Sequence, residues 1–493
     1  MRATALPPIF ALLVLAAALA APGKLLGDPD TYWHIAAGQW MLAHGAVPRA
    51  DPFSFSVPGA PWVAHEWLSE LGLALAWRAG GWGGVVLLAA AAAAVAMSNL
   101  VRHLGRVLAP LPVLVLALLA TATLAPVLLA RPHILALPAM EAFVAGLLAA
   151  RAASRAPSPA LLGVMALWAN LHGGFVLGLA LVPPLALEAA LAAAPVARAR
   201  VVRDWGVFCA GAVLAGCLTP QTWHGLVFPF HLLAMHTALG AIGEWRSPDF
   251  GQMQPVEIWL LAALGLAGMR SVRLPPIRLA LLLGLVHLGL AHGRDGVLVG
   301  MIGPLLAAEA LARSREQQEA FAVTHASCSR PLSDRVIQTG GGRAQAIGLG
   351  AGIALASLWL LAHPVRRGTE AISPQAALAH LPPGLAQAPV FNDYDFGGYL
   401  IFAGIRPFID GRADLYGDRF MDTYLRAMHP DRATLVALLD RYAVTWTLLR
   451  PGDGAVPLLD AMPGWRRLYS DETAIVHVRP DARAALEPPA PAL

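Results

Sequence analysis

WGGVVLLAAAAAAVAMSNL, residues 82–100, is an apolar run without a charged side chain. Its length matches the roughly 20 residues with which an α-helix crosses the hydrocarbon core of a bilayer. Ten more apolar runs lie along the chain, at 8–26, 109–129, 133–150, 159–170, 174–193, 205–219, 256–270, 276–292, 295–312 and 344–362. The sequence therefore predicts an α-helical polytopic membrane protein with about eleven transmembrane helices.

The composition of the whole chain agrees with many membrane spans. Of the 493 residues, 57% are hydrophobic and 13% are charged, whereas a soluble protein carries about 25% charged residues. The formal net charge of +4 comes from arginine, because Lys24 is the one lysine. We interpret the arginine excess as genomic composition and expect no nucleic-acid partner.

The connections between the spans set the expected orientation. Arginine-rich connections alternate with connections that carry few arginines. Because cytoplasmic loops are enriched in Lys and Arg, eleven spans with a cytoplasmic N-terminus place every arginine-rich connection, including a linker at 313–343, in the cytoplasm. Residues 1–26 also resemble a signal peptide, and we expect an uncleaved anchor because the loop that follows needs a fixed start.

Two domains are expected, because the composition changes after Pro364. Residues 1–363 form a transmembrane domain, with its first extracytoplasmic loop at 27–66. Residues 364–493 form a soluble extracytoplasmic α/β domain. Its expected elements are a helix at 431–442 that starts near Asp431 and strands at 389–392, 406–410, 444–449 and 473–478.

The first outer loop opens with Gly27-Asp28-Pro29-Asp30, the strongest local signal for chemistry in the chain. Two carboxylates two residues apart can bind a divalent metal such as Mg or Mn through oxygen ligands. Alternatively, one of them can act as a general base. Asp30 also suits the N-cap of the helix that follows, which is a purely structural role.

That helix is expected at 31–43, lying on the membrane surface with Tyr32, Trp33 and Trp40 as interfacial anchors. His34 can approach Asp30, although a histidine on the polar face of a helix more often has no special role. His65 and Glu66 end the loop. We expect them either to return close to Asp28 or to cap the second span.

Further polar residues lie at the expected outer ends of spans. Arginine can hold a phosphate in a fork of N–H groups, or it can extend to lipid headgroups. Glu141 lies in the middle of the run 133–150, where a charge is costly. It can be protonated, can pair with another span or can serve a proton path. The candidate phosphate- or substrate-binding residues of this group are Arg131, His133, His172, Arg246 and Arg294.

Three stretches of the first loop, at 28–34, 51–55 and 62–67, resemble the first outer loop of bacterial C-type (GT-C) membrane glycosyltransferases. The lipopolysaccharide and protein-mannosyl types are the most similar. Arg131-Pro132-His133, the stretch 168–173 and the segments at 392–394 and 410–412 look like an uncharacterised branch of that superfamily. The resemblance covers most of the chain, and the first loop is its most specific part.

The resemblance implies an enzyme of the bacterial inner membrane. It would move a sugar from a polyprenyl-phosphate carrier to a glycan, lipid or protein acceptor outside the cytoplasm. Asp28 matches the loop aspartate that such enzymes use as base or metal ligand. The paired Asp-Glu of many relatives is missing here, which leaves the metal open, and no other cofactor is implied. We therefore expect Asp28 and Asp30 as catalytic residues and His65 and Glu66 as substrate contacts.

Two other functions compete with this interpretation. A transporter of lipid-linked sugars would show internal repeats and paired broken helices, and no repeat is visible in this chain. A non-catalytic assembly or scaffold protein would use the C-terminal domain as its partner module. The polar residues of that domain can bind an acceptor or can simply occupy turns: Asn392, Asp393, Asp395, Asp410, Arg412, Asp414 and Tyr416.

Overall fold

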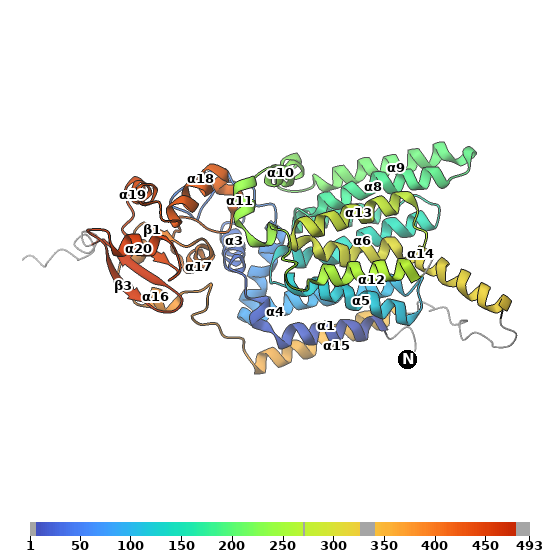
Figure 1. The fold of residues 1–493 in the computed structure, drawn as a ribbon, viewed down its shortest axis with the longest axis horizontal. Helices are drawn as coiled ribbons and strands as arrows, with labels where there is room; N and C mark the ends of the chain where they lie inside the picture. The colour runs from blue at the N-terminus through green and yellow to red at the C-terminus, as the bar shows by residue number, and fades with distance from the viewer. Residues whose placement is uncertain (1–5, 270–271, 326–340, 480–493) are drawn as a thin grey trace, which may run out of the picture. The chain divides into compact units, whose positions relative to one another are not determined.

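The computed structural model describes residues 6–269, 272–325 and 341–479 (Figure 1). The described chain is mostly helical, with one small sheet. It divides into two compact units, which we call the helical unit and the α/β unit. The helical unit comprises Met1–Leu25, Val86–Pro229 and Ile242–His363. The α/β unit comprises Leu26–Val85, Phe230–Ala241 and Pro364–Leu493.

The predicted boundary at Pro364 coincides with the start of the last segment of the α/β unit. This unit also contains the first loop and a short piece of the chain around residue 235. The helix α4 (Trp67–Leu104) connects the two units and is interrupted by non-helical backbone at Gly80 and Gly81. The predicted span 82–100 therefore begins directly after this kink.

The helical unit holds the apolar segments that the sequence predicts. Among the described residues, five helices are long and apolar enough to cross a membrane, and five shorter helices are also apolar. The chain is a multi-pass membrane protein, while the number of eleven spans stays a prediction. The helices of this unit, besides the second part of α4, are α1 (Leu6–Ala20), α2 (Pro22–Leu25), α5 (Pro110–Leu124), α6 (Pro132–Ala152), α7 (Ala160–Leu171), α8 (Phe175–Ala192), α9 (Pro195–Gly216), α10 (Trp223–Leu233, which runs into the α/β unit), α12 (Pro255–Met269), α13 (Pro276–Ala291), α14 (Gly296–His325) and α15 (Gly341–Ala362).

The first and last of these long helices, α1 and α15, lie side by side (Figure 1). Two helices reach into the predicted linker 313–343, because α14 continues to His325 and α15 starts at Gly341. That this linker is cytoplasmic stays a prediction. Its middle part, 326–340, lies outside the described residues.

A buried ion-pair network connects four helices of this unit. Arg278 on α13 is 2% exposed and lies 3.1 Å from both Glu188 on α8 and Glu309 on α14. Arg151 on α6 lies 3.1 Å from Glu188. Glu141, also on α6, is fully buried, and neither of its carboxyl oxygens has a hydrogen-bond partner among the described residues. Pairing of Glu141 with another span is therefore not seen in that part of the chain.

The α/β unit is built on a four-stranded sheet with the order β1-β2-β4-β3. The strands are β1 (Val390–Asn392), β2 (Trp446–Leu449), β3 (Arg466–Ser470) and β4 (Ile475–Val478). β1 and β2 are parallel, and the other two pairs are antiparallel. The helices of this unit, besides the first part of α4, are α3 (Asp30–His44), α11 (His236–Ala241), α16 (Gln375–Ala379), α17 (Gly397–Phe402), α18 (Ala413–Met428), α19 (Arg432–Arg441) and α20 (Ala455–Asp460).

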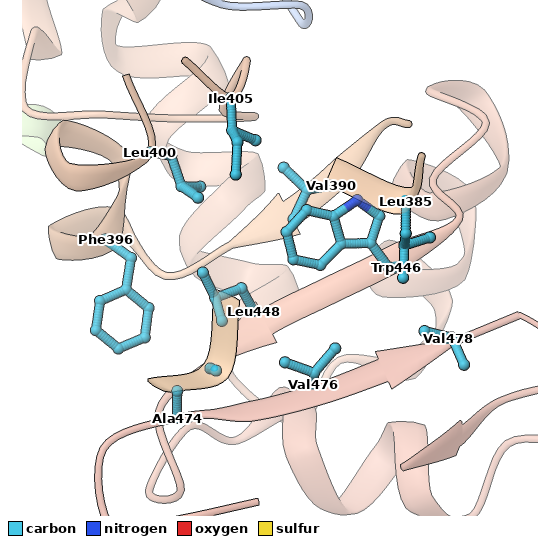
Figure 2. Packing of buried hydrophobic residues seen from close by; sticks show 11 residues of the cluster. Leu385, Val390, Phe396, Leu400, Ile405, Trp446, Leu448, Ala474, Val476 and Val478 are labelled. Atoms are coloured by element: carbon cyan, nitrogen blue, oxygen red, sulfur yellow. The ribbon is translucent and has the colours of Figure 1, made fainter. Parts of the chain in front are cut away.

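The core of this unit lies on one face of the sheet, where alternate strand residues meet short helices. Figure 2 shows Trp446 and Leu448 of β2 beside Val476 and Val478 of β4, with Phe396 at one end of the cluster. Full burial of each such side chain contributes about 1.5–3 kcal/mol relative to exposure. Burial of this apolar face stabilises the sheet in addition to the hydrogen bonds between its strands.

Most of the predicted elements of this domain are present. Strands were expected close to β1, β2 and β4, and β3 was missed. The helix expected at 431–442 is α19, and its cap is confirmed, since Asp431 accepts a hydrogen bond from Thr434 N at 3.0 Å.

The strand predicted at 406–410 is wrong. The Asn392 side chain accepts from Phe408 N at 2.7 Å and donates to Ile409 O at 2.8 Å. Phe55 of the first loop donates its N–H to Pro407 O at 3.3 Å. A side chain and a distant loop therefore take the backbone groups that a neighbouring strand would pair.

The first loop forms a second core with the C-terminal residues. Trp33 and Met41 of α3 pack with Trp62 and with Ile401 of α17. Tyr32 is buried as well and meets the Tyr399 ring edge-on at 5.1 Å between centroids. The prediction that Tyr32 and Trp33 anchor a helix at the membrane surface is therefore wrong, because protein covers both side chains.

Candidate functional site

The Asp28-Pro29-Asp30 turn leads into α3. Asp28 is 8% exposed, and its Oδ1 accepts a hydrogen bond from Asp30 N at 2.8 Å. The N-cap position belongs to Pro29, which makes no side-chain cap hydrogen bond. The prediction that Asp30 is the N-cap is therefore wrong. Asp28 instead makes the local turn that aspartate favours two residues before a backbone N–H.

Two glycines near the C-terminal end of the chain, Gly398 and Gly411, pack closely against this turn because they have no side chain. A Cβ atom at Gly411 would overlap Asp30 Oδ1, and a Cβ atom at Gly398 would overlap Pro29 O. Gly398 belongs to α17, and Gly411 lies in the Asp410-Gly411-Arg412 segment. The turn is thus held by residues almost 400 positions further along the chain.

Arg412 is the centre of a buried ion cluster beside Gly411. Its Nε and NH2 donate to Asp410 Oδ1 and Oδ2, each at 2.8 Å, and its NH1 donates to Asp51 Oδ1 at 2.7 Å. Tyr416 donates its hydroxyl to Asp410 Oδ2 at 2.6 Å. Burial alone would lower the pKa of Arg412, but the Asp410 carboxylate outweighs it and holds this pKa well above its usual value. The cluster stabilises the contact between the first loop and the C-terminal residues.

A second polar group forms where His34 of α3 meets the glutamates at the start of α4. His34 is 1% exposed, so the interpretation of it as a plain polar-face histidine is wrong. Its Nδ1 lies 3.5 Å from Glu70 Oε1, and its Nε2 lies 4.0 Å from Glu66 Oε2. His65 Nε2 lies 3.7 Å from Glu66 Oε1. Burial raises the pKa of Asp414, and the nearby His65 and Arg412 side chains partly offset this rise.

Glu70 was not among the predicted site residues. The sequence does hold a signal for it, because Glu66 and Glu70 are four residues apart at the start of a helix and so share a face. The structure joins His65 and Glu66 to each other and, through Glu66, to His34. That His65 and Glu66 converge on Asp28 stays a prediction.

The helical unit brings two of the predicted arginines together around one carboxylate. Arg131 NH1 lies 3.1 Å from Glu244 Oε2, and Arg294 NH1 lies 2.9 Å from Glu244 Oε1. The Arg294 guanidinium stacks over the Trp245 ring at 4.6 Å. Burial of Glu244 favours its neutral form, but Arg131 and Arg294 dominate and lower its pKa to about 2. Glu244 is therefore a carboxylate at neutral pH.

The remaining predicted residues lie around this pair of arginines. His133 Nε2 donates to Val127 O at 2.8 Å, and its ring centroid is 6.3 Å from that of His172. His172 Nδ1 accepts from Gly174 N at 3.0 Å. The Arg246 carbonyl accepts from Gly293 N at 2.9 Å, which joins the loop of Glu244 to that of Arg294.

The candidate residues thus form two groups. Asp28, Asp30, His65 and Glu66 belong to the α/β unit, and the group around Arg131 belongs to the helical unit. Among the described residues, no three or more His, Cys, Asp and Glu side chains form a cluster that could hold a metal ion. Asp28 and Asp30 offer a pair of carboxylates, a number that suits Mg²⁺, which usually binds one or two carboxylates together with substrate phosphates.

The fold of the chain is that of C-type (GT-C) glycosyltransferases. It is similar to the oligosaccharyltransferase AglB from Archaeoglobus fulgidus in complex with an inhibitory peptide and a dolichol-phosphate, with a TM-score of 0.51 and 10% identity over 89% of this chain and 69% of that chain. The fold expected from the first loop is thereby confirmed. No family model and no curated protein sequence matches the chain.

Two structures of ArnT from Cupriavidus metallidurans also match. The apo state has a TM-score of 0.48 and 16% identity, and covers 97% of this chain and 98% of that chain. The structure with bound undecaprenyl phosphate has a TM-score of 0.46 and 15% identity, and covers 94% of this chain and 97% of that chain.

Proposed function

We propose that this chain is a membrane glycosyltransferase that moves a sugar from a polyprenyl-phosphate carrier to an acceptor outside the cytoplasm. The observation that carries the proposal is the Asp28-Pro29-Asp30 turn, in which a buried and a half-buried carboxylate are fixed at the start of the first loop of a GT-C fold. AglB, whose structure contains a dolichol-phosphate, supports a lipid-phosphate carrier as the donor class. The acceptor is a glycan, a lipid or a protein.

Asp28 is the residue that we propose for the chemistry. An acceptor hydroxyl needs a base while it attacks the anomeric carbon of the sugar. The hydrogen bond from Asp30 N to Asp28 Oδ1 fixes the orientation of the Asp28 carboxylate. The same two carboxylates would instead act as ligands if the reaction uses Mg²⁺ or Mn²⁺.

Arg131 and Arg294 are proposed to stabilise the phosphate that leaves. Negative charge develops on the carrier phosphate as the sugar departs, and preorganised cations stabilise that charge. Both guanidiniums already point at one anionic group, Glu244, so their positions suit an anion. We propose His65, Glu66, His133, His172 and Arg246 as further substrate contacts.

The location follows from the same proposal. We propose the bacterial inner membrane, with the N-terminus in the cytoplasm and residues 364–493 outside it. The apolar helices and the arginine distribution support this arrangement. A carrier of the polyprenyl class would reach such a site through the lipid phase.

The test is an analysis of cell-envelope glycans in a strain that lacks the gene. The strain is complemented with the wild type, with Asp28→Asn or with Asp422→Asn, a control that makes the same change at an exposed aspartate of α18. We expect the wild type and Asp422→Asn to restore a missing sugar and Asp28→Asn to leave it missing at equal protein level. Full restoration by Asp28→Asn would overturn the proposal in favour of a scaffold or a transporter.

A second measurement separates the two roles of Asp28. Membranes from the wild-type strain are assayed with and without EDTA, followed by Mg²⁺ or Mn²⁺. If EDTA abolishes the activity and Mg²⁺ or Mn²⁺ restores it, Asp28 and Asp30 act as metal ligands. Activity that survives EDTA indicates that Asp28 acts as a base.

A further inference from the structure

Glu244 occupies the space between the two arginines that the proposed function assigns to phosphate. It lies on a single 3₁₀ turn, Gly243–Trp245, and both of its carboxyl oxygens contact Arg131 NH1, at 3.2 and 3.1 Å. Arg294 NH1 donates to Oε1 at 2.9 Å. The three side chains are 16–25% exposed, so the group is within reach of a ligand.

The chemistry of this group is that of an anion site with its anion in place. A guanidinium binds carboxylate and phosphate oxygens with the same fork of N–H donors. Two guanidiniums face one carboxylate, and Asp295, next to Arg294 in the sequence, interacts electrostatically with Arg294 and with Glu244. A phosphate monoester carries more charge and more acceptor oxygens than Glu244, so it is the stronger ligand for two arginines.

Arg131, Arg294 and Glu244 lie on different elements of the fold. Arg131 is the N-cap residue of α6, and Arg294 lies in the turn that leads into α14. Glu244 lies in a connection between α11 and α12, outside both helices. Displacement of Glu244 therefore requires its side chain to leave the two guanidiniums, while Arg131 and Arg294 keep their places at the N-terminal ends of α6 and α14.

We propose that Glu244 is a resident counter-anion, which holds Arg131 and Arg294 in position in the empty site and is displaced by the phosphate of a polyprenyl monophosphate. This inference rests on the proposed function, which assigns the two arginines to phosphate. Competition by Glu244 weakens the affinity for the lipid phosphate and speeds its release after sugar transfer. The opposite role, in which Glu244 only positions the arginines for the phosphate, predicts the opposite effect of removing its charge.

The test measures lipid binding to the full chain in nanodiscs of neutral phosphatidylcholine. The probes are undecaprenyl phosphate, undecaprenol and inorganic phosphate. The variants are Glu244→Gln, Arg294→Gln and the control Glu257→Gln, which changes a glutamate in the first turn of α12. We expect Glu244→Gln to bind undecaprenyl phosphate about tenfold more tightly than the wild type, which corresponds to about 1.4 kcal/mol. Arg294→Gln should lose binding, and Glu257→Gln should leave it unchanged.

The other outcomes are also decisive. Unchanged or weaker binding of undecaprenyl phosphate by Glu244→Gln, at an unchanged melting temperature, would overturn the counter-anion role and leave the proposed function intact. If the wild type binds undecaprenol as tightly as it binds undecaprenyl phosphate, the proposed phosphate site is refuted, and this inference is refuted with it. If inorganic phosphate binds as tightly as undecaprenyl phosphate and Glu244→Gln strengthens its binding, the counter-anion role is supported with free phosphate as the ligand.

A measurement on the wild type covers the case that Glu244→Gln does not fold. Displacement of Glu244 frees the turn Gly243–Trp245 from its contacts with Arg131 and Arg294. Hydrogen exchange of this turn should therefore become faster when undecaprenyl phosphate binds. Slower or unchanged exchange would overturn the proposal.

Discussion

Arg412 NH1 and Asp51 Oδ1 lie 2.7 Å apart, although 361 positions separate the two residues in the sequence. Both side chains are fully buried. The Arg412 guanidinium also lies over the Trp62 ring at 4.8 Å, so it meets both an anion and an aromatic residue of the first loop. The first loop and the C-terminal residues are thus parts of one folded body, and the first prediction concerns this contact.

Arg412→Ala should destabilise the α/β unit strongly. It leaves the Asp51 and Asp410 carboxylates buried without their common cation, and breaking a buried ion pair in this way costs about 3–5 kcal/mol. Thermal unfolding of the full chain in detergent measures the effect. Arg426→Ala is the control, because Arg426 makes an exposed ion pair with Asp431, and such pairs contribute little. Equal melting temperatures of the two variants would contradict the importance of the buried cluster.

Gly411→Ala should displace the Asp28-Pro29-Asp30 turn, because the new Cβ atom would overlap Asp30 Oδ1. We expect the variant to be expressed but to restore less than about a tenth of the envelope sugar, since small misplacements of reacting groups can cost 10²-fold in rate. Gly452→Ala is the matched control, because its Cβ atom would meet nothing within 4 Å. Full restoration by Gly411→Ala would show that the position of the turn does not matter for the reaction.

Asp393 should make the stability of the C-terminal domain depend on pH. Burial raises the pKa of Asp393 to about 7, with Arg450 opposing and Asp453 and Asp395 adding to the rise. The native state then keeps a proton that the unfolded chain loses near pH 4. The stabilising contribution is therefore complete below about pH 4 and is lost as the pH rises through about 7, by on the order of 4 kcal/mol.

Asp393→Asn should remove the loss of stability that the C-terminal domain shows as the pH rises. Hydrogen exchange of β1 and β2, corrected for the intrinsic pH dependence of exchange, is the measurement, at pH 5 and at pH 8. We expect the wild type to lose protection between the two pH values and Asp393→Asn to keep it. Asp422→Asn, at an exposed position, should behave as the wild type does. Parallel pH profiles of wild type and Asp393→Asn would refute the prediction.

Glu188→Gln should destabilise the helical unit. Glu188 is the carboxylate that Arg278 and Arg151 share, and Arg278 is 2% exposed. Loss of its charge leaves buried guanidiniums short of a counter-ion, which we expect to cost about 3–5 kcal/mol. The melting temperature in detergent reports the effect. Asp204→Asn is the control, since Asp204 pairs with the exposed Arg203. A melting temperature of Glu188→Gln close to that of Asp204→Asn would contradict the prediction.

The helices of this protein were predictable because their signals are local. The runs at 82–100 and 133–150 needed only their own residues, and Asp431 marked the start of α19 by its type and place. The strand predicted at 406–410 failed for the opposite reason. Its backbone partners are the Asn392 side chain and Phe55 of the first loop, and no local pattern records such distant partners.

The candidate site was predictable in its residues and less so in their surroundings. Asp28, Arg131 and Arg294 stood out because all three lie at the expected outer ends of apolar runs. The burial of His34 and its contact with Glu70 depend on how α3 lies against α4, which the sequence does not show. The pairing of both arginines with Glu244 depends on three segments more than 40 residues apart, as the separations of 113 and 50 positions show.

The α/β unit is assembled from three separate pieces of the chain. During synthesis, the piece that contains Asp51 leaves the ribosome before most of the membrane helices exist, and the piece that contains Arg412 follows these helices. Trp33 and Trp62 of the first loop therefore gain their contacts with Ile401 and Arg412 only after the membrane helices have been made. A chain that stops before Pro364 lacks Ile401 and Arg412, so we expect proteases to cut its first loop more readily than that of the full chain.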